Sequence, residues 1–270
     1  SSRSSTNMCV SFVRFLTQYD PMTRGLDFKG MVDSIENVAD GSVVLLHACA
    51  HNPTGVDPTE AQWRELSDLF AKKRLFAFFD SAYQGFASGD TARDAFAVRH
   101  FEERGDIAMC VCQSFAKNAG LYGERVGALH VVTASPQQAK CVQSQINVIH
   151  RSELSTTPAF FARVAAKILD EPGLREQWER DIRTMSGRTI QMRHMLYDEL
   201  VKLGTPGTWQ HIVDQTGMFS YLGLDEKQCE RLVKEGHIYL VKTSRISMAG
   251  LNQNNVKYVA SWIDRVVREQ

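Results

Sequence analysis

The sequence has no excess of charge of either sign, little proline and no long apolar run. Its 270 residues include 31 Lys and Arg and 31 Asp and Glu, so the formal net charge at pH 7 is zero. A balanced charge gives no electrostatic footprint for nucleic acid or an anionic membrane, and we expect neither as a partner. The longest apolar stretch, residues 43–50, is interrupted by His47 and is far too short to span a bilayer. With 43% hydrophobic residues and 7 Pro, the composition predicts a folded globular chain and excludes a disordered one.

Cysteine is sparse, with six in the chain. Only Cys110 and Cys112 are close together, and no second Cys or His pair stands at the spacing of zinc ligands. We therefore expect no metal site. Isolated cysteines in such a pattern are typical of buried, reduced thiols in an intracellular protein.

The chain also lacks an initiating Met and an apolar segment of the kind that secretory signals carry. It begins with a Ser-rich stretch, residues 1–6, and runs at once into a strand-like alternation over residues 10–15. We expect the chain to lack the beginning of a longer protein, with a processed or tag-scarred terminus as the alternative.

Strand and helix signals alternate over residues 43–169. Strands are expected at 43–46, 75–79, 107–113 and 126–133. One helix is expected to begin after a cap at Asp57 or Thr59, and further helices are expected over 92–104, 136–150 and 158–169. This βαβ alternation predicts an α/β fold, a mostly parallel sheet with helices on both faces. Ligands of such sheets bind beyond the carboxyl ends of the strands, which draws attention to Asp80 and to the segment after Gln113.

The pattern changes near residue 173, where a single long helix is expected up to Leu203, with Gly204 as its stop. Short strands are then expected at 218–222, 238–241 and 245–248, and helices at 225–235 and 254–268. We interpret residues 1–172 as a large domain and residues 173–270 as the long connecting helix with a smaller α+β domain.

The segment Ser-Phe-Ala-Lys-Asn-Ala-Gly-Leu-Tyr-Gly-Glu-Arg-Val-Gly, residues 114–127, is the most informative. An arbitrary Lys is usually a solvated surface residue. Lys117, however, follows a buried strand, where desolvation can lower the pKa of an amine and make it a nucleophile. Such an amine suits the Schiff-base chemistry of pyridoxal phosphate, and Ser114 and Arg125 are suitable donors to a phosphate.

This segment resembles the cofactor-lysine segment of class I aminotransferases of fold type I, and the aspartate aminotransferases in particular. Three further segments are similar to that family in the same order: His-Asn-Pro-Thr-Gly at 51–55, Asp-Ser-Ala-Tyr-Gln-Gly-Phe at 80–86, and Ser-Arg-Ile-Ser-Met-Ala-Gly-Leu at 244–251. The resemblance extends from Arg14 to the C-terminus. It implies pyridoxal 5′-phosphate as cofactor and residues 1–172 as the cofactor-binding domain, incomplete at its N-terminus.

The resemblance also implies roles for single residues. Lys117 is implied to be the Schiff-base lysine and the group that moves the proton at the substrate α-carbon. Asp80 is implied to pair with the pyridinium nitrogen of the cofactor, although a cap or turn residue is the alternative. Tyr83 and Asn52 are implied donors to the cofactor's phenolic oxygen, and Ser114 and Arg125 are implied to hold its phosphate. An X-Pro bond is where cis peptides occur, and a cis bond at Asn52 is one way to aim its side chain inward.

Two further arginines bear on the substrate. Arg245 is implied to bind the substrate α-carboxylate as a bidentate fork, together with Asn52. Arg151 is implied to reach the partner subunit's active site and bind a side-chain carboxylate, which favours Asp and Glu. The alternative for Arg151 is a helix C-terminal charge. The family's Ser-Asn-Pro-Pro after this Arg is replaced here by Ser-Thr-Thr-Pro at 155–158.

The activity implied by the resemblance is ping-pong transamination of L-aspartate with 2-oxoglutarate, giving oxaloacetate and L-glutamate. Two alternatives remain open: a related class I aminotransferase with aromatic or broader substrates, and a truncated non-catalytic polypeptide. The latter is kept because the family's phosphate-binding loop, ring-stacking aromatic and partner-reaching Tyr have no counterpart in this sequence. The resemblance further implies a homodimer with shared active sites in the cytoplasm, with the mitochondrial matrix as the alternative compartment.

Overall fold

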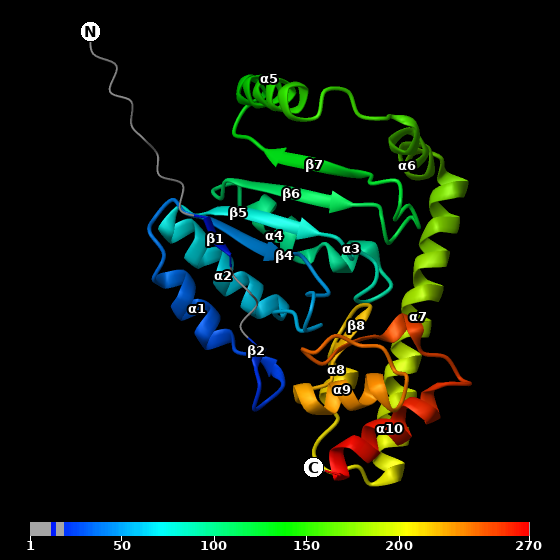
Figure 1. Cartoon of the computed structure of the whole chain (residues 1–270). Helices are drawn as coiled ribbons and strands as arrows, with labels where there is room; N and C mark the ends of the chain where they lie inside the picture. The colour runs from blue at the N-terminus through cyan, green and yellow to red at the C-terminus, as the bar shows by residue number, and fades with distance from the viewer. Residues whose placement is uncertain (1–11, 15–18, 270) are drawn as a thin grey trace.

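Five strands form one sheet in the order β1-β4-β5-β6-β7 in the computed structural model, which describes residues 12–14 and 19–269 (Figure 1). The strands are β1 (Phe12–Arg14), β4 (Val43–His47), β5 (Phe76–Ser81), β6 (Met109–Ser114) and β7 (Gly127–Val132). The first four run parallel, and β7 runs antiparallel to β6. The predicted mostly parallel α/β sheet is therefore confirmed. Of the expected strand at 10–15, residues 12–14 pair with β4 and the rest lies outside the described residues.

Three helices pack on one face of this sheet: α1 (Phe28–Glu36), α2 (Glu60–Lys73) and α4 (Phe96–Arg104). The core that they form with the sheet contains Met31, Ile35, Val44, Leu46, Trp63, Leu66, Leu69, Phe70, Ala77, Phe79, Ala97, Phe101, Met109 and Val111. On the opposite face Leu129 is 50% exposed and Phe78 is half-buried. A second helical layer, expected from the alternation, is thus not seen over this face among the described residues.

Two local hydrogen-bond patterns decide where helices begin. Thr59, not Asp57, caps α2: its hydroxyl accepts from the amide of Gln62, whose side chain accepts from the amide of Thr59. The helix expected at 92–104 is divided into α3 (Thr91–Asp94) and α4, with the break at Ala95. The Asp94 carboxylate accepts hydrogen bonds from backbone amides of the 85–88 loop, which accounts for a separate first turn.

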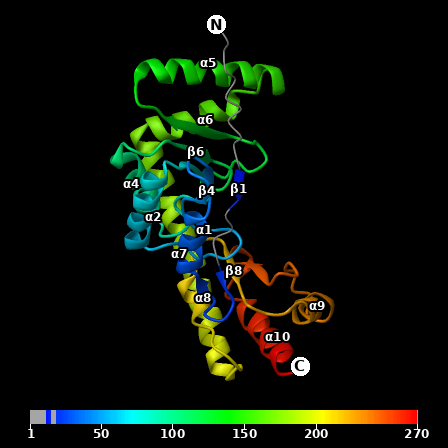
Figure 2. The same ribbon diagram turned by 90° about the vertical axis from the view of Figure 1, so that its left-hand side faces the viewer.

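The second half of the chain begins with α5 (Pro136–Glu153) and α6 (Phe160–Asp170), which lead into α7 (Pro172–Leu203). The 32-residue helix α7 runs from the sheet to the C-terminal elements (Figure 1, Figure 2). It ends at Gly204, which has a φ of 61°. The remaining elements are α8 (His211–Asp214), β8 (Phe219–Tyr221), α9 (Glu226–Lys234), β9 (Arg245–Ser247), the 3₁₀ turn η1 (Met248–Gly250) and α10 (Val256–Arg268).

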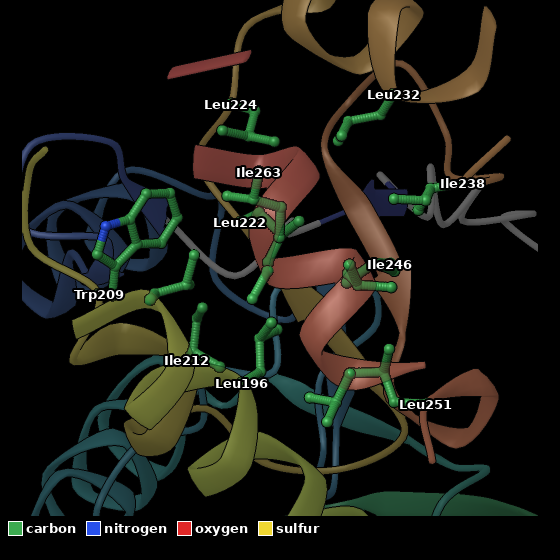
Figure 3. Packing of buried hydrophobic residues seen from close by; sticks show 14 of the residues in the cluster. Leu196, Trp209, Ile212, Leu222, Leu224, Leu232, Ile238, Ile246, Leu251 and Ile263 are labelled. Atoms are coloured by element: carbon green, nitrogen blue, oxygen red, sulfur yellow. The ribbon is translucent and has the colours of Figure 1, made fainter. Parts of the chain in front are cut away.

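These C-terminal elements enclose a second hydrophobic core (Figure 3). It contains Met192, Leu196, Leu200, Trp209, Ile212, Leu222, Leu224, Cys229, Leu232, Ile238, Ile246, Met248, Leu251, Val256, Val259, Ala260, Ile263 and Val266. The antiparallel pair of β8 and β9 lies over it. The strand expected at 238–241 is wrong: these residues alternate between buried and exposed, but they pair with no strand among the described residues. Ile238 instead packs into the core and its amide donates to the Leu232 carbonyl, so burial alone explains the alternation.

A short hairpin links the start of the described chain to this second core. Its strands are β2 (Tyr19–Asp20) and β3 (Gly25–Leu26). The ring of Tyr19 packs on Tyr221 with 4.9 Å between centroids, and Arg24 donates to the Thr208 carbonyl at 3.0 Å. Among the described residues, no helix has both the length and the apolar character needed to cross a bilayer.

Candidate active site

The carboxyl ends of β4, β5 and β6 open into two adjoining cavities of 630 and 370 Å³, and both are lined by Ala116 and Lys117. Of the residues predicted from the sequence, Asn52, Tyr83, Lys117 and Arg245 line the larger cavity. Asp80, Ser114, Lys117 and Arg125 line the smaller one. Lys117 therefore stands where the two groups of predicted residues meet.

The backbone next to Lys117 is held in place by buried contacts of Asn118. Asn118 is 2% exposed, and its side-chain amide donates to the Gln84 carbonyl at 3.2 Å. The Asn118 carbonyl accepts from the Trp178 indole of α7 at 2.7 Å. The Lys117 ammonium lies 4.8 Å from the centroid of the Tyr83 ring and makes no salt bridge with any described carboxylate. A fixed backbone with an unpaired amine suits a group that reacts with a ligand.

Asp80 lies near the end of β5, in register with His47 on β4 and Cys112 on β6. Its carboxylate faces the smaller cavity, on the sheet face opposite the α1–α2–α4 core. Ser114 and Arg125 line the same cavity. The Ser114 hydroxyl accepts from the Ala116 amide at 3.2 Å, and Arg125 donates to the Tyr122 carbonyl at 3.1 Å. One cavity thus holds an acid, a hydroxyl, a guanidinium and an amine.

Asn52 connects the two groups that face it in the larger cavity. Its side-chain amide donates to the Tyr83 hydroxyl at 3.3 Å, and its oxygen accepts from Arg245 at 2.6 Å. The Asn52–Pro53 peptide bond is cis. Asp57, the other cap candidate for α2, accepts from the amides of Ala50 and His51 at 2.6 and 2.9 Å and holds this turn.

Arg245 enters from β9 in the C-terminal half of the chain. Its guanidinium carbon lies 4.4 Å from the centroid of the Phe219 ring on β8. With Asn52 on one edge and Phe219 on its face, the guanidinium is oriented while donors remain for a carboxylate. Residues nearly 200 positions apart in the sequence thus form one side of the cavity.

Arg151 is not brought to this cavity. It is exposed on α5 and lines a separate surface groove made of α5 residues. Helix α5 has no buried residue and lies at the end of the molecule opposite the C-terminal elements that carry Arg245 (Figure 1, Figure 2).

Residues 6–263 match the family described as aminotransferase class I and II. The chain belongs to this family. It is 51% identical over 252 residues to the cytoplasmic aspartate aminotransferase of Saccharomyces cerevisiae, covering 91% of this chain and 60% of that protein. It is also 51% identical to the mitochondrial aspartate aminotransferase of Xenopus tropicalis, covering 93% of this chain and 58% of that protein.

Solved structures show the same aminotransferase fold. The structure of the yeast cytoplasmic enzyme matches with a TM-score of 0.89 over 93% of this chain and 62% of that chain. An aromatic-amino-acid aminotransferase from Burkholderia pseudomallei, covalently bound to pyridoxal phosphate, matches with a TM-score of 0.90 and 40% identity, covering 92% of this chain and 62% of that chain. The chain thus spans about three fifths of the length of these aminotransferases.

One residue that lines the larger cavity, Arg188, is not predicted from the sequence. Arg188 donates to the carbonyls of Ala249 and Leu251, both at 2.8 Å, and so holds the segment that follows Arg245. An arginine on a long helix is typical of a solvated face, so its sequence carries no signal of this contact. Phe219 also lines this cavity, with its ring against the Arg245 guanidinium.

Two buried histidines predict how stability depends on pH. Burial lowers the pKa of His51 to about 3 and that of His211 to about 4, from 6.5. Both remain neutral in the folded chain while they protonate in the unfolded chain below pH 6.5. The free energy of unfolding is therefore expected to be highest above pH 6.5 and to fall toward pH 4, by about 1.4 kcal/mol per pH unit for each histidine.

Urea denaturation between pH 7.5 and pH 4.5 measures this loss. His211→Gln removes the titrating ring from a position remote from the cavities while keeping a donor to the Leu222 carbonyl. In this variant the free energy of unfolding should change less steeply with pH, because one proton fewer is taken up on unfolding. An unchanged slope would show that His211 is not held neutral by the fold.

Proposed function

We propose that the protein transfers the amino group of L-aspartate to 2-oxoglutarate with pyridoxal 5′-phosphate as cofactor. The observation that carries this proposal is the position of Lys117, which faces Asp80, Ser114 and Arg125 in one cavity and Arg245 in the other. The 51% identity to aspartate aminotransferases supports it.

The groups of the smaller cavity fit the cofactor in their chemistry. A carboxylate at Asp80 suits a protonated ring nitrogen, because an opposite charge favours the protonated form. The Ser114 hydroxyl and the Arg125 guanidinium suit a phosphate, and the Lys117 amine suits an aldehyde. When bound, pyridoxal phosphate supplies an electron sink for the substrate α-carbon.

The chain's own side chains would then divide the remaining work. Lys117 would take the proton from the substrate α-carbon and donate it to the aldehyde-derived carbon of the cofactor, since its amine lies at the junction of the two cavities. Arg245 binds the α-carboxylate, and Asn52 orients Arg245 through the 2.6 Å hydrogen bond. Tyr83, which accepts from Asn52, is placed to donate to the cofactor's phenolic oxygen.

Turnover tests the proposal directly. The purified chain is loaded with pyridoxal phosphate, and oxaloacetate is measured after aspartate and 2-oxoglutarate are added. We expect turnover of aspartate and a cofactor absorbance band. A preference for phenylalanine over aspartate would favour the aromatic or broader-specificity alternative, and a chain that takes up no cofactor would favour the truncated, non-catalytic one.

We also propose that the chain has two domains of fold type I, a large cofactor-binding one over residues 1–172 and a small α+β one over residues 173–270. Two separate hydrophobic cores support this division, one around the sheet and one around β8 and β9. Helix α7 contacts both proposed domains. Ile182 lies against Gly85, in the half of the chain that forms the sheet, whereas Leu196 and Leu200 lie in the second core.

A homodimer with shared active sites is part of the proposal, with Arg151 binding the substrate's side-chain carboxylate in the partner subunit. The exposure of α5 supports it, because Val148 and Ile149 are each 60% exposed beside Arg151. Such apolar exposure is typical of a surface that another chain covers.

Mixing two impaired variants tests whether Arg151 acts across subunits. Arg151→Val alone should lower kcat/KM for aspartate by about 10²-fold, because a substrate carboxylate is left without its cation. Mixed with Lys117→Ala, it forms hybrids in which one of the two sites keeps both residues. Recovery of up to a quarter of the native activity is expected from random pairing, and no recovery would place Arg151 in its own subunit's site.

For the cellular location we propose the cytoplasm, with the mitochondrial matrix as the alternative. The five described cysteines are all free, which fits either reducing compartment. The similarity does not separate the two, since one relative is cytoplasmic and another mitochondrial at the same 51% identity. Fractionation of cells that express the tagged full-length gene distinguishes them.

A further inference from the structure

Arg193 of α7 is a buried cation whose guanidinium is held by the carbonyls of one loop. The residue is 2% exposed and forms no salt bridge with a described carboxylate. It donates to the Ile212 carbonyl at 2.9 Å, and its other terminal nitrogen donates to the carbonyls of Thr216, Gly217 and Phe219. Burial lowers its pKa to about 10, so it stays charged at pH 7. Because a buried charge is costly, its carbonyl partners must stay in place for the fold to tolerate it.

The segment that Arg193 holds, residues 212–219, runs from α8 to the first residue of β8 and is called here the carbonyl loop. It lies against residues 50–57, called here the asparagine turn. The Thr216 amide donates to the Gly55 carbonyl at 2.7 Å, and the Thr216 hydroxyl donates to Asp57 at 2.9 Å. The two backbones also touch, since a Cβ on Gly217 would come within 2.6 Å of the Ala50 Cβ. The carbonyl loop and the asparagine turn are therefore docked by both hydrogen bonds and close packing.

Both segments contact Arg245. In the asparagine turn, Asn52 accepts the hydrogen bond of the Arg245 guanidinium. In the carbonyl loop, Phe219 presents its ring to the same guanidinium at 4.4 Å. A change in how the two segments dock would therefore move the two neighbours of Arg245 relative to each other.

We propose that Arg193 is a positioning residue: it holds the carbonyl loop against the asparagine turn and thereby sets the orientation of Arg245 for the substrate carboxylate. The docking of the two segments stands on the contacts above. The consequence for substrate rests on the proposed function.

Amide hydrogen exchange tests the docking without requiring activity. Arg193→Lys keeps the charge but cannot reach four carbonyls, and Thr216→Val removes the hydroxyl that donates to Asp57. In each variant, exchange in both residues 50–57 and residues 212–219 should be about tenfold faster. Leu200→Val is the matched control for a general loss of stability, because Leu200 lies in the second hydrophobic core and, like Arg193, on α7. It should leave the exchange rates of residues 50–57 unchanged.

Substrate binding tests the consequence. In Arg193→Lys and Thr216→Val, the KM for aspartate and the Kd for succinate, a dicarboxylate without an amino group, should both rise about tenfold. kcat should change by less than about threefold, because Lys117 and the smaller cavity are not touched. Leu200→Val should change neither constant.

The exchange measurement and the binding measurement distinguish which part of the proposal is wrong if the expected results are not obtained. Unchanged exchange at 50–57 in both Arg193→Lys and Thr216→Val, or changes no larger than those of Leu200→Val, would overturn the role of Arg193. Faster exchange with unaltered KM and succinate Kd would overturn its effect on Arg245. A native chain that binds succinate but does not turn over aspartate would refute the proposed function. In that case the succinate Kd and the exchange rates of the variants would still test the positioning role of Arg193. If Arg193→Lys does not fold, Thr216→Val decides alone.

Discussion

Lys117→Ala is expected to lower aspartate turnover by about 10⁴-fold or more, because it removes the amine that is proposed to bind the cofactor and to move the α-proton. The fold should persist. The backbone at this point is held by Asn118 through the Gln84 carbonyl and the Trp178 indole, and neither contact involves the Lys117 side chain. Steady-state kinetics with aspartate and 2-oxoglutarate measure the loss.

Borohydride gives this prediction a second readout. Reduction of the loaded native chain should fix the cofactor on the peptide that contains Lys117, and mass spectrometry should find no such adduct in Lys117→Ala. Lys117→Arg is the matched control, because it keeps the positive charge beside the Tyr83 ring but supplies no nucleophilic amine. Turnover by either variant within tenfold of the native rate would refute the mechanism.

Arg245→Gln should lower kcat/KM for aspartate by about 10²- to 10³-fold, the effect of removing one partner from a desolvated, hydrogen-bonded charge pair. The loss should be expressed mainly in KM for both aspartate and 2-oxoglutarate, because the two substrates share the α-carboxylate. Glutamine keeps a polar group near Asn52 but cannot form the two-pronged contact.

The matched control for Arg245→Gln is Arg180→Gln, which removes an exposed guanidinium from α7 outside both cavities. It should leave kcat/KM unchanged within about twofold, since an exposed ion pair contributes little. Uptake of the cofactor, followed by its absorbance, should be normal in both variants. An Arg245→Gln chain with native KM would show that another group binds the α-carboxylate.

Much of the sheet half could be predicted because its signals are local. Apolar runs of four to six residues give β4 and β5, and Thr59 with Gln62 forms a capping box within four positions of the chain. The same locality explains why the segment around Lys117 identifies the family, since its residues run without interruption from the last residue of β6 to the first residue of β7.

Two secondary-structure predictions failed where the deciding contact is made with residues outside the predicted element. The alternation at 238–241 reads as a strand, but Ile238 is buried by a core and not by a sheet partner. The break between α3 and α4 depends on Asp94 binding amides of the 85–88 loop, and no helix propensity encodes that contact.

The amino-acid sequence is enough to predict the family, the α/β alternation and the site residues Lys117, Asp80, Asn52 and Arg245, because each of these residues lies within a short ordered motif. Which of these residues come into contact depends on how the chain folds. It places Arg245 within hydrogen-bond distance of Asn52, 193 positions away, leaves Arg151 on a distant exposed helix, and buries Arg193 among the carbonyls of a loop. The physical reason is that such contacts arise when separate elements dock. The residues that come into contact are then determined by packing and by the need to satisfy buried polar groups. A single stretch of sequence contains only one of the two residues in each contact, so it does not predict the other.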